Sequence, residues 1–394
     1  MTSPSRDIGS ELLLAGSGLG LGWDWRLALD QALDGALAPL QAEAPDLLVL
    51  FVSAAYGDDF ADVLVAAAQR SRAREVTGCS ASGVIAMERE VEAEPGLAAL
   101  ALRLPPGALL AVQPAPEDND VNPLWLGIAA GDCMGLIVLA DPFTTDAMAL
   151  IDGLEKAYPG VPIVGGMATG EPGVQATSVF SGGRVSNGAV VIGLGGTVGV
   201  QPVVSQGCEP IGENWTITDA EGHIVRAIGG RPAYQVLVET VRALDPDRRQ
   251  RVNGNLLIGL AMDEYRDEFR RGDFLIRNFL GADPNTGAIA IAAQVRVGQT
   301  LQFQIRDARA ADEELRLMLG AVGGSTPAAA LLFACNGRGV GLFGAPDHDA
   351  RTVRTLLGPL PLAGLFCNGE IGPVGAATYI HGFTASLALI ASTI

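Results

Sequence analysis

The stretch that decides the fold lies near the C-terminus and reads LLFACNGRG at residues 331–339, followed by LAGLFCNGEIGPVG at residues 362–375. Each segment begins with an apolar run and ends in Cys-Asn-Gly, which predicts a buried strand that enters a tight turn. Asn and Gly both tolerate positive φ, so each strand is expected to turn sharply and leave its backbone amides exposed. A helical run separates the two segments, which predicts a strand–helix–strand unit.

Polar side chains gather around these two turns, and they are the main candidates for a ligand site. The set consists of Asn336, Arg338, Asn368, Glu370 and His381, with the thiols of Cys335 and Cys367. Open α/β sheets usually bind ligands at the carboxyl ends of their strands, so we expect these residues to line a pocket. Arg338 and Glu370 would then hold the carboxylate and the ammonium group of a zwitterion. The structural alternative is a salt bridge that ties the two loops together.

The same order of elements occurs three times, at residues 46–104, 135–195 and 330–391. In each copy a strand and a helix are followed by a glycine-rich turn, in which Gly78, Gly165 and Gly364 lie five residues before a second glycine. We therefore predict an internal repeat. The expected fold class is α+β with α/β-like repeats: layered β-sheets covered by helices, built from β-α-β-β units in two halves. The expected domains are residues 22–200 and residues 201–394.

Composition limits the class of protein. A chain of 394 residues with 48% hydrophobic and 18% charged residues is globular rather than disordered. The net charge of −18 argues against binding to nucleic acid or to anionic membranes, because like charges repel. Five cysteines, an odd and widely spaced set, fit free thiols in a reducing compartment better than a disulfide framework.

One segment raises the question of a membrane span. Residues 185–207 carry no charge, and a spanning helix needs about 20 apolar residues. The segment is rich in glycine and valine and contains Pro202. These residues form poor helix, so we predict buried strands with turns and no membrane span.

Motifs along nearly the whole chain resemble the FIST family (F-box and intracellular signal transduction proteins). They are DLLVLFVS at 46–53, EVTGCSASGVI at 75–85, IVGGMATG at 163–170, SQGCEPIGENWTIT at 205–218 with GRPA at 230–233, DFLIRNFLGADPNTGAI at 273–289, LQFQIRDA at 301–308, LLFACNGRG, LAGLFCNGEIGPVG and HGFT at 381–384. The resemblance implies a FIST N-terminal and a FIST C-terminal domain. It also implies a cytoplasmic sensory module that binds a small polar metabolite, such as an amino acid, without catalysis.

The resemblance brings no established catalytic residue and no cofactor. No appended output domain or F-box is visible, so we expect the signal to pass through a partner protein. Two alternatives to a sensory module stay open, a cysteine-dependent hydrolase or transferase and a protein–protein adaptor.

The cysteine-dependent alternative would need a base beside Cys335 or Cys367, and His381 is the candidate on this stretch besides His348. The structural reading is that small cysteines flanked by apolar residues pack as hydrophobes. Zinc is not expected, because the paired spacing of a tetrahedral site is missing. Arg277, Arg306 and Asp307 are further candidates for ligand contacts or for ion pairs that close turns. Cys79 and Ser80 would be shared with a pocket in the C-terminal half.

Overall fold

The computed structural model describes residues 12–116, 121–171, 176–266, 268–269 and 271–393. Contacts between residues divide the chain into two compact units. The first comprises Met1–Val204, Arg316–Ile380 and Thr384–Ile394, and the second comprises Ser205–Leu315 and His381–Phe383. Both units combine segments that are far apart in the sequence, so they do not test the predicted boundary between domains at residues 200 and 201. That boundary stays a prediction.

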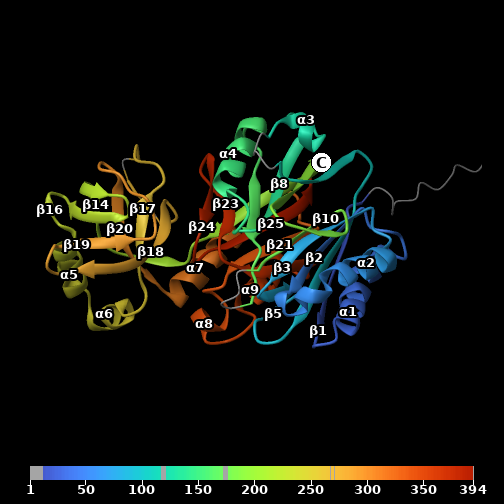
Figure 1. Cartoon of the computed structure of the whole chain (residues 1–394), viewed down its shortest axis with the longest axis horizontal. Coiled ribbons are helices and arrows are strands. Elements are labelled where there is room, and N and C mark those ends of the chain that lie inside the picture. The colour runs from blue at the N-terminus through green and yellow to red at the C-terminus, as the bar shows by residue number, and fades with distance from the viewer. Residues whose placement is uncertain (1–11, 117–120, 172–175, 267, 270, 394) are drawn as a thin grey trace, which may run out of the picture. The chain divides into compact units, whose positions relative to one another are not determined.

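The first unit consists of three copies of one chain order, which can be followed by colour in Figure 1. The first copy contains β1 (Leu14–Leu21), α1 (Trp25–Leu37), η2 (Ala38–Leu40), β2 (Leu47–Ser53), η3 (Ala54–Asp59), α2 (Phe60–Ser71), β3 (Glu75–Ala81), β4 (Gly83–Ala86), β5 (Arg89–Val91) and β6 (Gly96–Arg103). The second contains β7 (Ala108–Pro114), α3 (Pro123–Leu126), β8 (Cys133–Ala140), α4 (Ala147–Ala157), β9 (Ile163–Met167), β10 (Val179–Ser181), β11 (Arg184–Ser186) and β12 (Ala189–Gly196). The third contains β13 (Val198–Ser205), β21 (Ala329–Cys335), α8 (Val340–Phe343), α9 (His348–Leu357), β22 (Leu362–Cys367), β23 (Glu370–Val374), β24 (Ala377–His381) and β25 (Ala385–Ser392).

The strands of the three copies form three six-stranded sheets, and these sheets have the same strand order. The orders are β1-β6-β2-β3-β10-β11, β7-β12-β8-β9-β23-β24 and β13-β25-β21-β22-β4-β5. In each sheet four strands come from one copy, and a hairpin from another copy adds the last two. The first sheet takes the hairpin of the second copy, the second sheet that of the third, and the third sheet that of the first. The predicted repeat of β-α-β-β units is therefore confirmed.

Close packing explains why the first residue of each Gly-x₄-Gly stretch is glycine in all three copies. Gly78, Gly165 and Gly364 lie in β3, β9 and β22, opposite Leu50, Val138 and Leu332 of the parallel neighbour strand. A Cβ at these glycines would lie 1.8, 1.9 and 2.0 Å from the carbonyl oxygen of that partner. We predicted that the Gly-x₄-Gly stretches form turns, and this was wrong for most residues of each stretch. These residues belong to β3, β9 and β22, and the turn comes after each strand. The first glycine serves close packing between strands rather than a turn.

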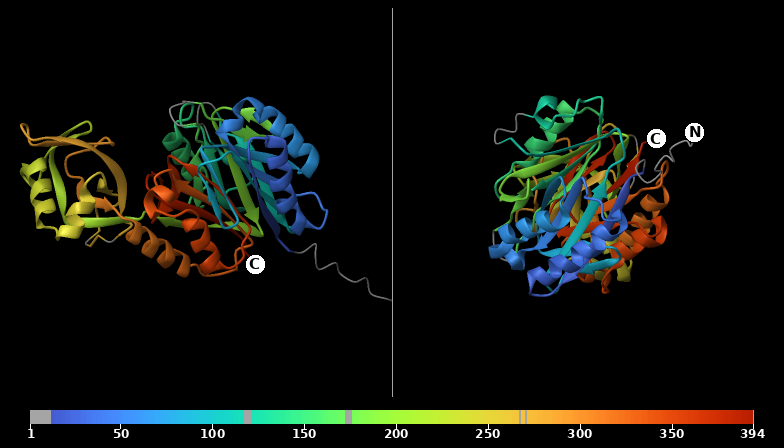
Figure 2. Two further views of the ribbon diagram at one scale, coloured as in Figure 1. Left: turned by 90° about the horizontal axis from the view of Figure 1, so that it is seen from below. Right: turned by 90° about the vertical axis from the view of Figure 1, so that its right-hand side faces the viewer.

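One apolar core joins the three sheets and contains equivalent residues of each, such as Phe51, Leu139 and Phe333. On the other face of the first sheet a second core packs α1 and α2 against β2, β3 and β6, with Leu33, Leu48 and Leu64 fully buried. Figure 2 shows these two helices on one side of that sheet. Layered sheets covered by helices are therefore confirmed.

The second unit is an antiparallel β-structure, inserted in the chain between β13 and β21. Its elements are β14 (Cys208–Glu221), β15 (Ile224–Ile228), β16 (Arg231–Pro232), α5 (Ala233–Ala243), α6 (Pro246–Val252), β17 (Leu256–Ala261), β18 (Phe274–Asp283), β19 (Ala288–Ile291) and β20 (Thr300–Arg306). The order is β14-β20-β17-β18-β19-β15-β16, and an additional pairing of β14 with β15 closes the first six strands into a ring. Ile258, Phe303 and Ile305 fill its core. Helix α7 (Ala308–Gly320) continues the chain toward β21.

The uncharged segment 185–207 forms strands, as predicted: it covers parts of β11 and all of β12 and β13. Among the described residues, no helix has both the length and the apolar character that a membrane crossing needs.

Candidate functional site

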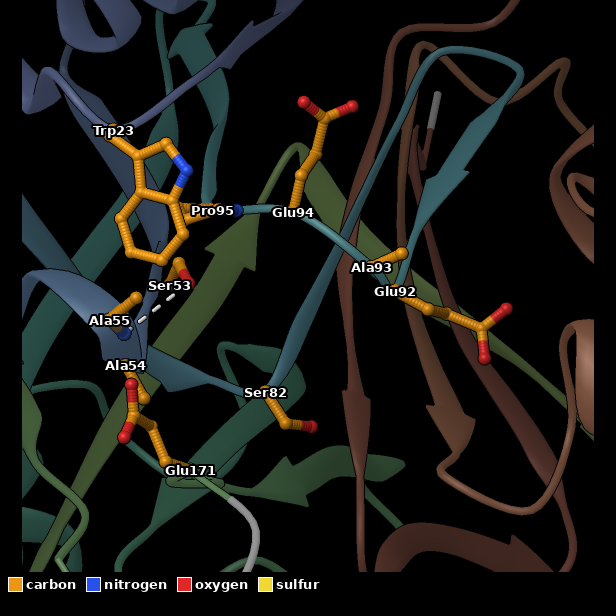
Figure 3. Close-up of a pocket in the computed structure, with 10 residues that line it drawn as sticks. All are labelled: Trp23, Ser53, Ala54, Ala55, Ser82, Glu92, Ala93, Glu94, Pro95 and Glu171. Carbon is orange, nitrogen blue, oxygen red and sulfur yellow. Dashed lines mark hydrogen bonds between the residues drawn. The ribbon is translucent and has the colours of Figure 1, made fainter.

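A hollow of about 240 Å³ opens where β2 and β3 end, and Figure 3 shows its lining. We call it the strand-end hollow. Its lining combines an aromatic ring, carboxylates, hydroxyls and small apolar groups: Trp23, Glu92, Glu94, Glu171, Ser53, Ser82, Ala54, Ala55, Ala93 and Pro95. Because β2 and β3 are parallel neighbours, both present their carboxyl ends here, where α/β sheets usually bind ligands.

Two serines mark the ends of these strands. Ser53 is the last residue of β2, and its Oγ accepts a hydrogen bond from the Ala55 amide at 3.4 Å as the chain enters η3. Ser82 follows β3, and its Oγ donates to Asn336 Oδ1 at 3.1 Å, while its amide donates to Thr169 Oγ1 at 2.8 Å. The first, second and third copies therefore meet at Ser82, beside the hollow.

Trp23 supplies the aromatic ring of the hollow. It lies in the turn between β1 and α1, where the Asp24 side chain caps α1 by accepting a hydrogen bond from the Arg26 amide at 2.9 Å. The cap fixes the start of the helix, and the Trp23 side chain stays 80% exposed. A large aromatic ring at the surface, next to a hollow, is available for contact with a ligand.

The carboxylates of the hollow come from two connections. Glu92 and Glu94 lie between β5 and β6, and in Figure 3 their side chains leave the chain in different directions. Glu171 follows β9. Among the described residues, Glu94 and Glu171 make no hydrogen bond or ion pair, and none of the residues that line the hollow is Lys or Arg. The lining therefore attracts cations.

Glu92 has a structural role as well. Helix α8 has no side-chain cap of its own, and the Val340 amide at its start donates to Glu92 Oε1 at 2.9 Å. Glu90 does the same for α9, where the Ala350 amide donates to Glu90 Oε1 at 2.8 Å. In return the Glu90 amide donates to Asp347 Oδ1 at 2.8 Å. Carboxylates from the first copy therefore cap two helices of the third.

Arg338 lies in the loop before α8, and its position differs from our expectation. We expected it to line a ligand pocket together with Glu370, but the side chain is fully buried and forms a bidentate ion pair with Asp349 of α9. Nε lies 2.6 Å from Oδ2, and Nη2 lies 2.8 Å from Oδ1. Burial alone would raise the pKa of Asp349, yet Arg338 lowers it to about 2. Burial, and next the charge of Asp349, raise the pKa of Glu90 to about 7.

Glu370 is also buried rather than solvent-facing. Its Oε1 accepts from the Gly369 amide at 3.2 Å, and Oε2 accepts from the Thr384 amide at 3.2 Å. Burial raises the pKa of this carboxyl to about 8. The equivalent hairpin residues in the other two sheets are Val84 and Val179. The third copy therefore has a glutamate, Glu370, at a position that is valine in the other two copies.

The five cysteines are reduced thiols, and all are buried. Cys335 and Cys367 lie opposite each other at the ends of β21 and β22. Burial raises the pKa of Cys79, and burial together with Glu370 raises that of Cys367, which disfavours either thiol as a nucleophile at neutral pH. Among the described residues, no group of three or more His, Cys, Asp and Glu side chains has the arrangement of a metal site.

The remaining predicted residues of the first unit have different surroundings. Ser80 is buried in β3, where its Oγ donates to the Thr169 carbonyl at 3.0 Å, so its contact is structural. Asn336 and Asn368 are exposed, as expected for turns after strands. Asn336 contacts a residue of the hollow, because its Oδ1 accepts the hydrogen bond from Ser82 Oγ.

Four predicted residues belong to the second unit. Asp307 pairs with Arg251 and accepts a hydrogen bond from the Ala310 amide at 2.8 Å at the start of α7. The Arg306 guanidinium lies 5.9 Å from the centre of the Phe383 ring. Arg277 Nη1 donates to the Ile276 carbonyl at 2.9 Å, and burial lowers its pKa. His381 is buried. The contacts described for these four residues are contacts within the protein. Their role in ligand binding stays a prediction.

Sequence reasoning missed the residues that give the strand-end hollow its charge and its ring. Trp23 lies before the first repeated segment, and Glu92 and Glu94 lie in a connection without periodicity. Glu171 could have been selected from the sequence, because it directly follows the second glycine of the second Gly-x₄-Gly stretch. The residue at the same place in the third stretch is Glu370, which we did select.

The fold and the hollow define a three-copy α/β protein with a small acidic site at the ends of parallel strands. Comparison with known families is more specific: residues 46–231 match the FIST N domain and residues 233–373 match the FIST C domain. The chain therefore belongs to the FIST family, as its motifs predict. FIST domains are sensory domains of signal transduction.

Relatives of similar length occur in mycobacteria. The uncharacterized protein Mb0898c of Mycobacterium bovis is 42% identical over 381 residues, which cover 93% of this chain and 96% of that protein. The uncharacterized protein Rv0628c of Mycobacterium tuberculosis is 39% identical over 380 residues, which cover 95% and 98%. Among solved structures, cyanuric acid hydrolase from A. caulinodans is similar with a TM-score of 0.36 and 10% identity, covering 97% of this chain and 100% of that one. This likeness is too low to carry an argument.

Proposed function

We propose that the chain is a cytoplasmic sensory module that binds a small ligand with an ammonium or similar cationic group in the strand-end hollow, without catalysis. The observation that carries the proposal is the lining itself. Glu92, Glu94 and Glu171 surround a hollow that has an exposed Trp23 and no basic side chain among its described residues. A cation over the face of a tryptophan gains about 0.5–2 kcal/mol, and carboxylates add charge-assisted hydrogen bonds.

The size of the hollow limits the ligand. Pockets for drug-sized molecules have about 300–1,000 Å³, and the strand-end hollow has about 240 Å³. The ligand is therefore a small metabolite. The hydroxyls of Ser53 and Ser82 are available to fix its orientation, although each already makes a hydrogen bond within the protein.

The charge of the lining favours amines over amino acids. An amino acid needs a cation for its carboxylate, and Arg338, which we had assigned to that role, is occupied by Asp349. The net charge of −18 supports the same preference, because a negative protein raises the local concentration of cations. Free cysteines fit a cytoplasmic location. We infer that the signal passes through a partner protein.

A matched ligand series tests the proposal. Thermal unfolding would be followed with primary amines, with their neutral N-acetyl forms and with the corresponding amino acids. Binding to the folded state alone raises the unfolding midpoint, so we expect amines to raise it and the N-acetyl forms to leave it unchanged. Trp23→Ala should abolish the rise, whereas Asp62→Asn, the loss of an exposed carboxylate outside the hollow, should preserve it. A rise with neutral or anionic compounds only would overturn the proposal.

A further inference from the structure

Cys335 and Cys367 form a pair that the strand register brings together. They are the last residues of β21 and β22, two parallel neighbours, and they lie directly opposite each other. Neighbouring strands are about 4.8 Å apart, and paired residues point to the same face. Disulfide-bonded cysteines have Cα atoms about 4.4–6.8 Å apart. Backbone geometry therefore already gives the spacing that a disulfide between these two thiols needs.

The fold does not require thiols at these positions. In the first copy the same opposite pair is Ser53 and Ala81. In the second copy the corresponding residues, three positions after the paired Val138 and Gly165, are Asp141 and Ala168. The three sheets share one strand order, so packing of β21 against β22 alone does not explain the two cysteines.

The surroundings of the two sulfur atoms differ. The Gly337 amide donates to Cys335 Sγ at 3.4 Å, and Arg338 is the next residue. Burial would lower the pKa of Arg338, but Asp349, and to a smaller extent Cys335 and Glu90, raise it. A donor N–H and a nearby guanidinium both stabilise a thiolate at Cys335. Cys335 is also the more accessible of the two, at 6% exposure against 0% for Cys367.

Cys367 faces a proton acceptor instead. Its Sγ donates to Glu370 Oε1 at 3.4 Å. Burial raises the pKa of Glu370 to about 8, so this carboxyl becomes ionised as the pH approaches 8 and is then a stronger base than an ordinary carboxylate. Burial and Glu370 raise the pKa of the Cys367 thiol, which makes it a poor first nucleophile. Cys367 is therefore suited to attack second, with its proton passing to Glu370.

We propose that Cys335 and Cys367 are a redox-active dithiol that a hydroperoxide oxidises to a disulfide. The Cys335 thiolate attacks one oxygen of hydrogen peroxide, an S–O bond forms and the O–O bond breaks, and the leaving hydroxide takes a proton from solvent to become water. Cys367 sulfur then attacks the Cys335 sulfenic acid and gives its proton to the ionised form of Glu370. The S–S bond forms as the S–O bond breaks, and the leaving hydroxide takes that proton back from Glu370 and departs as a second water. Two thiols are oxidised and one peroxide is reduced.

Peptide mapping of the full chain tests this. The reduced protein would be treated with hydrogen peroxide under native conditions, its remaining thiols alkylated, and the digest analysed by mass spectrometry without reduction. We expect two of the five thiols to be lost, one cross-linked peptide that joins Cys335 to Cys367, and full reversal by dithiothreitol. The proposal is overturned if all five thiols stay alkylatable, if a different pair is linked, or if the link forms only in denaturant.

Variants separate the two roles. Cys367→Ser should leave Cys335 as a sulfenic acid that a dimedone probe captures, whereas Cys335→Ser should give neither probe capture nor cross-link. Cys79→Ser, the loss of another buried thiol, should form the cross-link like the natural sequence. Capture at Cys367 in the Cys335→Ser variant would overturn the assigned order of attack. The mapping of the unsubstituted chain stays decisive if a variant does not fold.

Discussion

The Glu92 carboxylate accepts a hydrogen bond from the Val340 amide at 2.9 Å, so a single side chain both lines the strand-end hollow and caps α8. Ser82, on the same hollow, bonds to Asn336. The loop from Asn336 to Val340 therefore supports the hollow at two points, and Arg338 anchors that loop in the core.

Two variants of Glu92 distinguish the effect of its charge on amine binding from the effect of its helix cap on stability. Gln retains an oxygen that accepts the Val340 hydrogen bond, so Glu92→Gln should keep the free energy of unfolding within about 0.5 kcal/mol and weaken amine binding. Glu92→Ala removes the cap as well and should cost about 1 kcal/mol. Urea unfolding and calorimetry measure the two effects. Equal amine affinity in Glu92→Gln and the natural sequence would show that the charge of Glu92 does not act on the ligand.

The Arg338–Asp349 pair should matter for stability far more than any surface pair. Asp349→Ala leaves a buried guanidinium without its partner and should lower the free energy of unfolding by about 3–5 kcal/mol. Arg70, which pairs with Asp30 and Asp34 at the surface, provides the control, and Arg70→Ala should cost at most about 1 kcal/mol. Similar losses for both variants would show that the buried pair is replaceable.

Glu370 should make stability fall as pH rises. Its folded pKa of about 8 lies above the ordinary value of 4.5, so between these two values the folded state holds a proton that the unfolded state has released. Stability from this group is therefore complete below pH 4.5 and is lost up to pH 8, by about 1.4 kcal/mol per pH unit at most. Glu370→Gln should remove this slope. Urea unfolding of both proteins at several pH values measures it, and parallel pH profiles would contradict the assignment.

The repeat glycines should not tolerate a side chain. In Gly364→Ala the new Cβ would lie 2.0 Å from the Leu332 carbonyl oxygen, and β22 would have to move away from β21. We expect a loss of about 1–3 kcal/mol or more. Gly341→Ala has open space around it and should change stability by less than about 1 kcal/mol. Thermal unfolding of the two variants compares them directly, and an unaffected Gly364→Ala would contradict the strand packing.

Much of the fold was predictable, because strand and helix periods are local properties of sequence. The helix at residues 348–357 and the chain order of strand, helix and strand that recurs three times follow from apolar periods and from glycine spacing. The exchange of hairpins between copies is not encoded locally, and neither are the partners of buried charges. Arg338 and Glu370 follow similar Asn-Gly turns, yet Arg338 pairs with Asp349 on the next helix. The strand-end hollow was missed because Trp23 and Glu92 of the first copy and Glu171 of the second come together only in the folded chain.

The most direct test of cation binding in the hollow is calorimetry with the amine that stabilises the protein most. The double variant Glu94→Gln, Glu171→Gln removes two carboxylates that make no hydrogen bond or ion pair among the described residues, so stability should stay nearly unchanged. Loss of two charge-assisted contacts at about 1.5–3 kcal/mol each should weaken the amine affinity at least about a hundredfold. An unchanged dissociation constant in this variant would contradict the account.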